Sequence, residues 1–312
     1  MNPRFPLYIP SKGRWESMLT SRALDRMGVD HRIVVEESQL AAYSAVAPRE
    51  RLLVLDPEYQ RRYDTFDSLG DAKSKGPGPA RNFIWEHSIS EGHQHHWVMD
   101  DNIRGFYRLN KNLKIPVGDG TIFAVMEEFA LRYENVAMSG PNYCMFAPRK
   151  VAVPPFVVNT RIYSCNLIRN DVPFRWRGRY NEDTDLSLRM LKAGWCTIQF
   201  NAFLQEKVPT QTIKGGCDED FYKREGTLPK SHILTKMHPD VARITMRFGR
   251  VHHHVNYKPF KANKLKLRAD VSVEPGVNNY GMELKQVDVG WKVARDKARA
   301  RESAASPDGG AK

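Results

Sequence analysis

Short apolar runs alternate with segments of helical spacing through the first hundred residues. Each run is brief, rich in branched or aromatic residues and followed by polar or turn-forming residues, which is typical of strands. Strand and helix in strict alternation predict a parallel, doubly wound sheet. The predicted strands are Phe5–Pro10, Arg32–Glu36, Arg51–Asp56 and His96–Met99, and the predicted helices are Trp15–Met27, Leu40–Val46 and Ala80–Ser90.

The second half of the chain has a mixed pattern that fits further strands of the same sheet. Strands are predicted at Asn135–Ser139, Arg161–Ile168 and Cys196–Phe200, with helices at Thr184–Lys192 and Lys230–Met237. We therefore expect one α/β domain over residues 1–262, built on a doubly wound mixed sheet flanked by helices. Residues 263–302 form a basic extension, and residues 303–312 have the composition of a disordered tail.

Composition places the chain among ordinary globular proteins. Of its 312 residues, 41% are hydrophobic and 27% charged, and no apolar run reaches the length needed to cross a bilayer. The first ten residues lack the pattern of a secretion signal, and the four cysteines form no CxxC pair. We expect neither a membrane nor a secreted protein, but one with free thiols in a reducing cytoplasm.

The positive charge is concentrated in two regions. The chain carries a net +12, of which residues 149–180 contribute +6 and residues 241–312 contribute +8. Such an excess favours a polyanionic partner, although a generally basic soluble surface would have the same composition.

Acidic residues follow the strand that ends at Met99. Asp100 and Asp101 come next, then Asn102, so their side chains are expected at the carboxyl edge of the sheet, where ligands bind. Two adjacent carboxylates suit a hard divalent cation shared with a diphosphate. The alternative is a turn or a helix cap.

Three consecutive histidines are a second candidate metal site. In an extended segment His252 and His254 share one face, while His253 points to the other. Imidazole can complete a carboxylate shell around manganese. A polar loop is the alternative.

A third candidate is the acidic run at the start of the predicted helix near residue 184. Glu182, Asp183 and Asp185 follow Asn181; acids in a first helical turn complement the helix dipole, but three carboxylates exceed that need. One of them is a candidate general base.

Basic residues supply two further candidate sites. Ser11, Lys12 and Arg14 follow the first strand, and Arg81 opens a helix, both being positions that suit a nucleotide or another anion. Guanidinium groups interleaved with aromatic rings, upstream of the acidic run, suit phosphate contacts and base stacking. Those predicted DNA-binding residues are Arg175, Trp176, Arg177, Arg179 and Tyr180.

Nine segments together resemble the TET-associated glycosyltransferases, enzymes of bacteriophages that act on oxidised or hydroxymethylated pyrimidines in DNA. The likeness covers roughly residues 5–267. It is carried by IPSKGR at 9–14, ARNFIWEH at 80–87, HWVMDDNIRGFYRLN at 96–110, SGPNYCMFAPR at 139–149, TRIYSCNLIRND at 160–171, RWRGRYNEDTDLSLRMLKAGWCT at 175–197, FNAFLQ at 200–205, TQTIKGG at 210–216 and FGRVHHHVNYKPFKANK at 248–264.

The resemblance implies a GT-A-like fold, a UDP-sugar donor, a divalent cation (Mn²⁺ or Mg²⁺) and modified DNA as acceptor, in the cytoplasm of an infected bacterium. It also implies a role for each candidate. Asp183 would be the base, with Glu182 and Asp185 as alternatives. Asp100, Asp101 and one of His252, His253 and His254 would bind the metal. Ser11, Lys12, Arg14, Glu36, Arg81 and Asp100 would hold the nucleotide-sugar.

Two other classes remain open at this point. A metal-dependent nuclease or phosphodiesterase also uses Asp, His and a basic surface. A DNA-binding protein without catalytic activity would share the charge but not the turnover.

Overall fold

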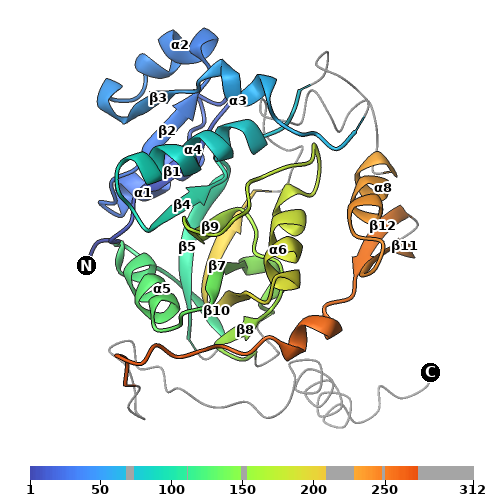
Figure 1. Cartoon of the computed structure of the whole chain (residues 1–312). Coiled ribbons are helices and arrows are strands. Elements are labelled where there is room, and N and C mark those ends of the chain that lie inside the picture. Colours follow the sequence, from blue (N-terminus) through green and yellow to red (C-terminus); the bar gives the residue numbers. More distant parts are fainter. Residues whose placement is uncertain (68–73, 111, 149–152, 209–227, 248–249, 273–312) are drawn as a thin grey trace, which may run out of the picture.

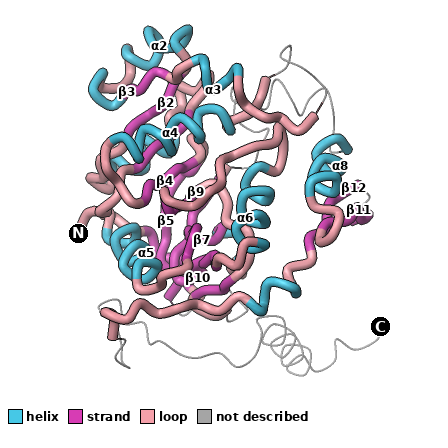
Figure 2. The backbone as a smooth tube through the Cα atoms, in the orientation of Figure 1, coloured by secondary structure: helices cyan, strands magenta, loops and turns pink. Residues whose placement is uncertain are grey.

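The computed structural model describes residues 1–67, 74–110, 112–148, 153–208, 228–247 and 250–272 (Figure 1). Its centre is a ten-stranded sheet in the order β3-β2-β1-β4-β9-β7-β10-β5-β6, with β8 paired to β10. Helices flank this sheet, and a small hairpin stands apart at one side (Figure 2). The expected α/β architecture, a mixed sheet between helices, is confirmed.

The first four strands of the sheet are parallel, as the alternating pattern predicts. β1 lies between β2 and β4, and β3 pairs with the outer side of β2. Their bounds are β1 Leu7–Pro10, β2 Arg32–Val35, β3 Leu52–Val54 and β4 His95–Met99.

The second half makes the sheet mixed. β9 runs antiparallel to both β4 and β7, while β10 is parallel to β7 and antiparallel to β5 and β8. β5 also pairs with β6. The bounds are β5 Ile103–Asn110, β6 Leu113–Pro116, β7 Val136–Tyr143, β8 Phe156–Val158, β9 Cys165–Arg169 and β10 Cys196–Lys207.

Alternating residues of the central strands face two different cores. Leu7 and Trp97 belong to a core that α1 and α5 cover, whereas Tyr8 and Val98 belong to one covered by α4 and α6. This two-sided burial is the reason that the short strands are almost entirely apolar. The helix bounds are α1 Leu19–Arg26, α2 Leu40–Ser44, α3 Pro57–Arg61, α4 Gly78–Ser90, α5 Thr121–Leu131 and α6 Glu182–Lys192.

A smaller unit packs on the outer side of α6. It consists of α8 Leu228–Met237 and the hairpin of β11 Ala242–Arg247 with β12 Arg250–Val255. Leu234 and Val255 meet Leu188 of α6 in a core of their own. The chain then continues as a short 3₁₀ helix, Lys258–Ala262, and an extended segment along the lower side of the sheet in Figure 1.

Several features differ from the pattern-based prediction. β5, β6 and α5 occupy a region for which no elements were predicted. Between the predicted strand Arg51–Asp56 and the predicted helix Ala80–Ser90, the structure has α3 and the buried Tyr63. Within the described part of the chain, no helix combines the length and apolarity needed to span a membrane. Cys144, Cys165 and Cys196 are free thiols. Residues 209–227 and 273–312, which include Cys217, most of the predicted extension and its tail, lie outside the described residues.

Candidate active site at the carboxyl edge of the sheet

The predicted acidic and basic residues meet at one edge of the sheet. Because β1, β2 and β4 are parallel, their carboxyl ends lie together. The first turns of α4 and α6 and the last residue of β10 reach the same edge, as the ion pairs below show. The structure thus brings together Ser11, Lys12, Arg14, Glu36, Arg81, Asp100, Asp101, Glu182 and Asp183.

Asp100 is held between two cations. Its Oδ1 accepts a hydrogen bond from Arg81 at 2.7 Å, and its Oδ2 accepts one from Lys207 Nζ at 2.6 Å. Burial would raise the pKa of Asp100, but Lys207 and Arg81 outweigh it and hold that pKa well below its usual range. Asp100 is therefore a permanent negative charge.

Arg81 joins Asp100 to the acids of α6. Its Nη1 donates to Asp183 Oδ1 at 2.7 Å and to Glu182 Oε1 at 3.1 Å. The Arg81 side chain is only 2% exposed, and its guanidinium lies 4.5 Å from the ring centre of Trp176. Burial opposes the charge, yet the carboxylates raise the pKa of Arg81 further above its ordinary value.

The position of Arg81 depends on the first turn of α4, which packs closely against Tyr63. Pro77 and Pro79 suit the first positions of a helix, and Tyr63 packs directly on Gly78. A Cβ at Gly78 would lie 1.9 Å from the Tyr63 hydroxyl oxygen. That hydroxyl also donates to the Gly178 carbonyl at 2.9 Å. Only glycine therefore fits one turn before Arg81.

Asp101 has a different environment from Asp100. Its carboxylate accepts a hydrogen bond from Ser11 Oγ at 2.8 Å and pairs with Arg14, and the Tyr43 hydroxyl lies 2.7 Å from Ser11 Oγ. Asp101 is nearly buried, and its contacts tie the loop after β1 to the loop after β4. Beside it, Lys12 Nζ pairs with Glu36 at 3.1 Å.

Of the three carboxyl groups that Arg81 joins, the two at the start of α6 have raised pKa values. Burial, reinforced by the Asp183 charge, raises the pKa of Glu182 to about 7. Burial also raises the pKa of Asp183, against the opposing effect of Arg81. A carboxyl that titrates near neutrality is suited to accept a proton.

Three further residues belong to this cluster, and the sequence analysis identified none of them: Lys207, Ser164 and Tyr143. Lys207 Nζ donates to Ser164 Oγ at 2.9 Å, and that oxygen lies 2.6 Å from the Tyr143 hydroxyl. β10 was predicted to stop at Phe200, so Lys207 was not placed at a strand end. A bulge between Glu206 and Lys207 shifts the register with β5, and bulges of this kind re-aim side chains beside active sites.

Asp185 does not belong to this cluster. It is completely buried and pairs with Arg177, Arg189 and His238, with the His238 contact at 2.9 Å. Burial opposes its ionisation, but these partners lower the pKa of Asp185. The structure therefore contradicts the alternative assignment of Asp185 as base, because three cationic or hydrogen-bonding groups already use its carboxylate inside the fold.

Most of the predicted DNA-binding segment is buried. Trp176 and Tyr180 are 2% and 6% exposed, so neither ring has a free face for a base. Arg179 is buried on Asp67, Arg175 pairs with Glu86, and Arg177 pairs with Asp185 as described. Burial contradicts the stacking role of Trp176 and Tyr180 and a phosphate contact by Arg179. Arg175 and Arg177 are partly exposed in their ion pairs, so DNA contact by these two stays a prediction.

The predicted metal-binding set is not assembled. His252, His253 and His254 lie on β12, in the hairpin that Figure 1 shows beyond α6, whereas Asp100 follows β4. No three His, Cys, Asp or Glu side chains of the described ranges are grouped so that they could hold a metal ion. The histidine part of the prediction is therefore wrong for this arrangement.

The acids at the carboxyl edge have the donor chemistry that a divalent cation takes, although the described residues do not form a ready-made group of three ligands. Asp100, Asp101, Glu182 and Asp183 are hard oxygen donors of the kind that Mg²⁺ and Mn²⁺ take. The described ion pairs set only three cations against these four acids, Arg14, Arg81 and Lys207. When all four acids are ionised, which requires a pH above the pKa of about 7 of Glu182, one negative charge is left over.

Aromatic side chains border the cluster. Tyr143 and Tyr163 are stacked with ring centres 5.3 Å apart, and Phe146 lies 5.5 Å from Tyr143. Phe146 is 47% exposed and Met145 is 67% exposed. These groups form an apolar border next to Ser164 and Lys207.

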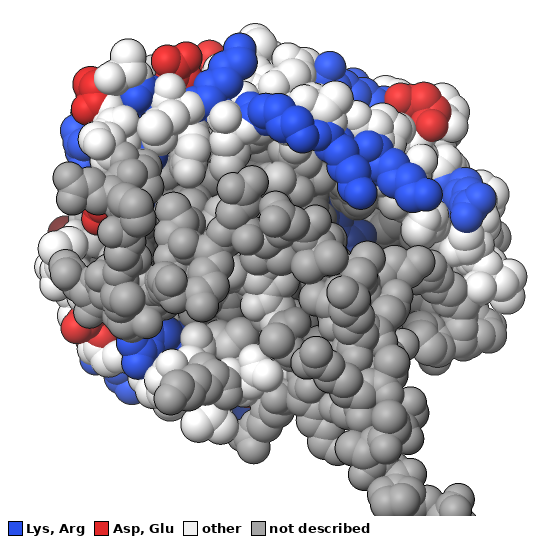
Figure 3. All heavy atoms as spheres, turned by 90° about the horizontal axis from the view of Figure 1, so that it is seen from below, with Lys and Arg blue, Asp and Glu red and all other residues white. Residues whose placement is uncertain are grey.

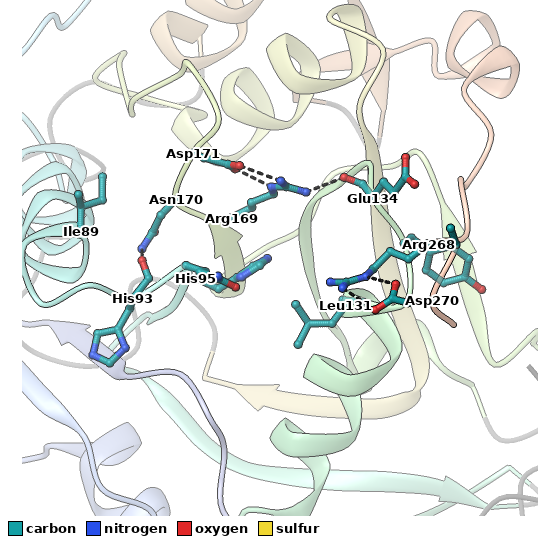
Figure 4. A pocket seen from close by; sticks show the side chains of 14 residues that line it. Ile89, His93, His95, Leu131, Glu134, Arg169, Asn170, Asp171, Arg268 and Asp270 are labelled. Carbon is teal, nitrogen blue, oxygen red and sulfur yellow. Dashed lines mark hydrogen bonds and ion pairs between the residues drawn. The ribbon is translucent and has the colours of Figure 1, made fainter. Parts of the chain in front are cut away.

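A separate cavity lies at the opposite edge of the sheet. It has a volume of about 780 Å³ and is lined by residues before β4, after β9 and at the end of α5 (Figure 4). Four of its charged groups form two ion pairs: Arg169 with Asp171 at 2.5 Å, and Arg268 with Asp270 at 2.8 Å. This cavity does not adjoin the carboxylate cluster.

An α/β domain that gathers acids and cations at the carboxyl edge of parallel strands has the architecture of enzymes that bind phosphorylated ligands there. The comparison with protein families makes the class definite: this is a glycosyltransferase, an enzyme that transfers a sugar. The chain belongs to the TET-Associated Glycosyltransferase family, whose model matches residues 5–216, more than half of its length. The sheet and its flanking helices are consistent with a GT-A-like fold. A search of curated proteins found no match.

Proposed function

We propose that this glycosyltransferase moves a sugar from a UDP-sugar to the hydroxyl group of a modified pyrimidine, of the 5-hydroxymethylcytosine type, in phage DNA. The observation that carries the proposal is the cluster of Asp100, Arg81 and Lys207 with the α6 acids. Family membership supports sugar transfer, and the family's association with DNA modification supports the acceptor. The cytoplasm of an infected bacterium is where such DNA would be modified.

The donor would occupy the edge formed by the loops after β1 and β4. Ser11, Lys12 and Arg14 line this edge beside Glu36, a suitable arrangement for the nucleotide. As the bond between the sugar and the diphosphate breaks, negative charge grows on the diphosphate and positive charge on the sugar. Lys207 and Arg81 are the cations placed to stabilise the leaving group.

A divalent cation fits the remaining negative charge of this edge. Asp100, Asp101 and the α6 acids would supply oxygen ligands to Mn²⁺ or Mg²⁺. The ion would have to replace a present partner, because Arg81 and Lys207 occupy the two oxygens of Asp100 and Arg14 and Ser11 occupy those of Asp101. When bound, the ion supplies further positive charge to the leaving diphosphate.

Asp183 is the proposed general base. The acceptor hydroxyl loses its proton to the Asp183 carboxylate while its oxygen bonds to the sugar carbon that the diphosphate leaves. The raised pKa of Asp183 suits this transfer, and its charge interacts with Arg81, Asp100 and Lys207 around the same point. Glu182 shares Arg81 with it and is the alternative base.

The acceptor base would meet the aromatic border instead of the segment 175–180. A base inside a duplex has to leave the stack before an enzyme can act on it. The exposed ring of Phe146 beside Tyr143 offers a stacking surface next to the cluster. We therefore expect Phe146→Ala to weaken the use of duplex acceptor more than the use of donor.

The direct test is transfer itself. Hydroxymethylated DNA is incubated with the enzyme, Mn²⁺ and a panel of UDP-sugars, and the released nucleosides are examined by mass spectrometry. We expect a sugar adduct with the wild type, a loss of at least about 10²-fold with Asp183→Asn, and normal turnover with the matched control Asp171→Asn, at the opposite edge.

Two results would contradict the proposal. No adduct with any UDP-sugar, despite stabilisation of the fold by UDP and Mn²⁺, would remove the DNA acceptor. Near wild-type turnover by Asp183→Asn would remove Asp183 as base and transfer the role to Glu182, which Glu182→Gln then tests.

A further inference from the structure

A row of basic side chains crosses the edge of the sheet opposite the active site. Figure 3 shows Lys and Arg side chains following one another across the molecule seen from below. Residues 258–268 contain five cations and no acid, and each of the five side chains is exposed. We call them the basic row: Lys258, Lys261, Lys264, Lys266 and Arg268.

The backbone under the basic row is fixed to the body of the protein. Asn159 Nδ2 donates to the Phe260 carbonyl at 2.8 Å, and Asn135 Nδ2 donates to that of Lys264 at 2.8 Å. The Asn263 side chain donates to the carbonyl of Leu191 in α6 and to that of Trp195, between α6 and β10. Phe260 is buried in the core beneath. The cations are thus held outward on an ordered backbone.

The lysines of the row have no structural task in the described part of the chain. Arg268 pairs with Asp270, but no ion pair or side-chain hydrogen bond of Lys258, Lys261, Lys264 or Lys266 is found among the described residues. By contrast, the arginines of residues 175–180 are each paired with an acid. Here the charges remain available to a partner.

The spacing of the row suits a chain of phosphates. In a 3₁₀ helix, residues i and i+3 lie on the same side, about 6 Å apart along the axis. Lys258 and Lys261 stand in this relation. In the extended part, every second residue lies on the same face, about 6.6 Å from the one before. Lys264, Lys266 and Arg268 have this spacing. The row spans roughly 30 Å, over which one DNA strand carries about nine phosphates.

We propose that the basic row is a docking surface for the phosphate backbone of DNA, separate from the site of sugar transfer. It lies at the amino-terminal edge of β7 and β10, because Asn135 directly precedes β7. The reacting base cannot be there, since Asp100 lies at the other edge. The row instead holds a distant part of a long acceptor and raises the local concentration of the rest. This inference rests on the proposed DNA acceptor.

The test compares two variants that each lose four positive charges. In one, Lys258, Lys261, Lys264 and Lys266 are changed to Ala. In the matched control, the exposed residues Arg22, Arg26, Arg49 and Arg104 are changed to Ala. Binding of unmodified duplex DNA is measured over a range of salt concentrations without donor. Transfer is measured on a hydroxymethylated ten-nucleotide strand and on a duplex of several hundred base pairs.

For the row variant we expect the slope of log K against log salt concentration to be shallower by about 3 to 4, because each lost phosphate contact contributes about 0.9. We also expect affinity lower by roughly tenfold or more, poorer use of the long duplex, and unchanged transfer to the short strand. The control should keep the wild-type slope.

An unchanged slope in the row variant overturns the inference. So does a loss equal to that of the control, which would mean a general charge effect. Loss of binding to anionic lipid vesicles without loss of DNA binding would instead assign the row to a membrane surface. If the wild type binds no DNA and modifies none, the proposed function fails, which is a different result from failure of the row alone.

Discussion

The two edges of the central sheet use charged residues in opposite ways. At the carboxyl edge, the buried Arg81 and the largely buried Lys207 are each bonded to carboxylates. At the other edge, Lys264 and Lys266 are exposed, and no acid pairs with them in the described part of the chain. Both edges are rich in basic side chains, but only at the carboxyl edge are these side chains paired with carboxylates of the protein.

The difference follows from solvent. A buried charge is tolerated only when it is paired, because desolvation costs several kcal/mol per ion, whereas an exposed lysine keeps its hydration. Net charge along the sequence therefore does not by itself show which of two basic regions keeps its charges free for a partner. Residues 149–180 carry a net +6, yet the arginines at 175, 177 and 179 all pair with acids.

The largest effect is expected where a buried cation is removed. Arg81→Ala leaves Asp100, Glu182 and Asp183 without their shared partner, and breaking such a buried network costs about 3–5 kcal/mol. Denaturant unfolding measures the loss. Arg268→Ala, which breaks an exposed pair at the other edge, serves as control and should leave the unfolding midpoint unchanged. Equal unfolding midpoints of the two variants would contradict the difference between the two edges.

Removing Lys207 separates catalysis from folding at the same edge. Lys207→Met keeps much of the side-chain volume but removes the charge beside Asp100. We expect transfer to fall by about 10²–10³-fold, as when a group that stabilises transition-state charge is lost. The midpoint of unfolding should change less than for Arg81→Ala. Wild-type turnover would show that Lys207 only balances Asp100.

Gly78→Ala tests how α4 places Arg81. The new Cβ would overlap the Tyr63 ring, so the ring or the start of α4 has to move. Overpacking of this kind costs about 1–3 kcal/mol, and transfer should fall because Arg81 shifts. Gly118→Ala meets no neighbouring atom and is the control. If Gly78→Ala is as stable and active as that control, the close contact does not position Arg81.

The smallest expected effect is a change in pH dependence. Because the folded pKa of Glu182 is raised to about 7, its contribution to stability is present in full below its ordinary pKa. It is lost as the pH rises through about 7. Glu182→Gln should therefore flatten the decline of the unfolding temperature between pH 5 and pH 8. An identical decline in both proteins would assign the titration to another group.

The sequence alone was sufficient for the class of fold and for much of the site. The strands β1, β2, β3 and β4 are runs of apolar residues because both faces of the sheet are covered, and such runs are visible without coordinates. Loops after parallel strands meet at one edge by geometry, so Ser11, Asp100 and their neighbours could be grouped correctly.

Tertiary structure alone decided which charges are paired. Lys207 reached Asp100 only because β10 continues past Phe200 and bulges at its end. Trp176 was enclosed behind Arg81, and the histidines of β12 were carried beyond α6. Burial and pairing depend on contacts between segments that are a hundred residues apart. Local composition does not encode such contacts. The basic side chains that keep their charge unpaired could therefore be identified only from the tertiary structure.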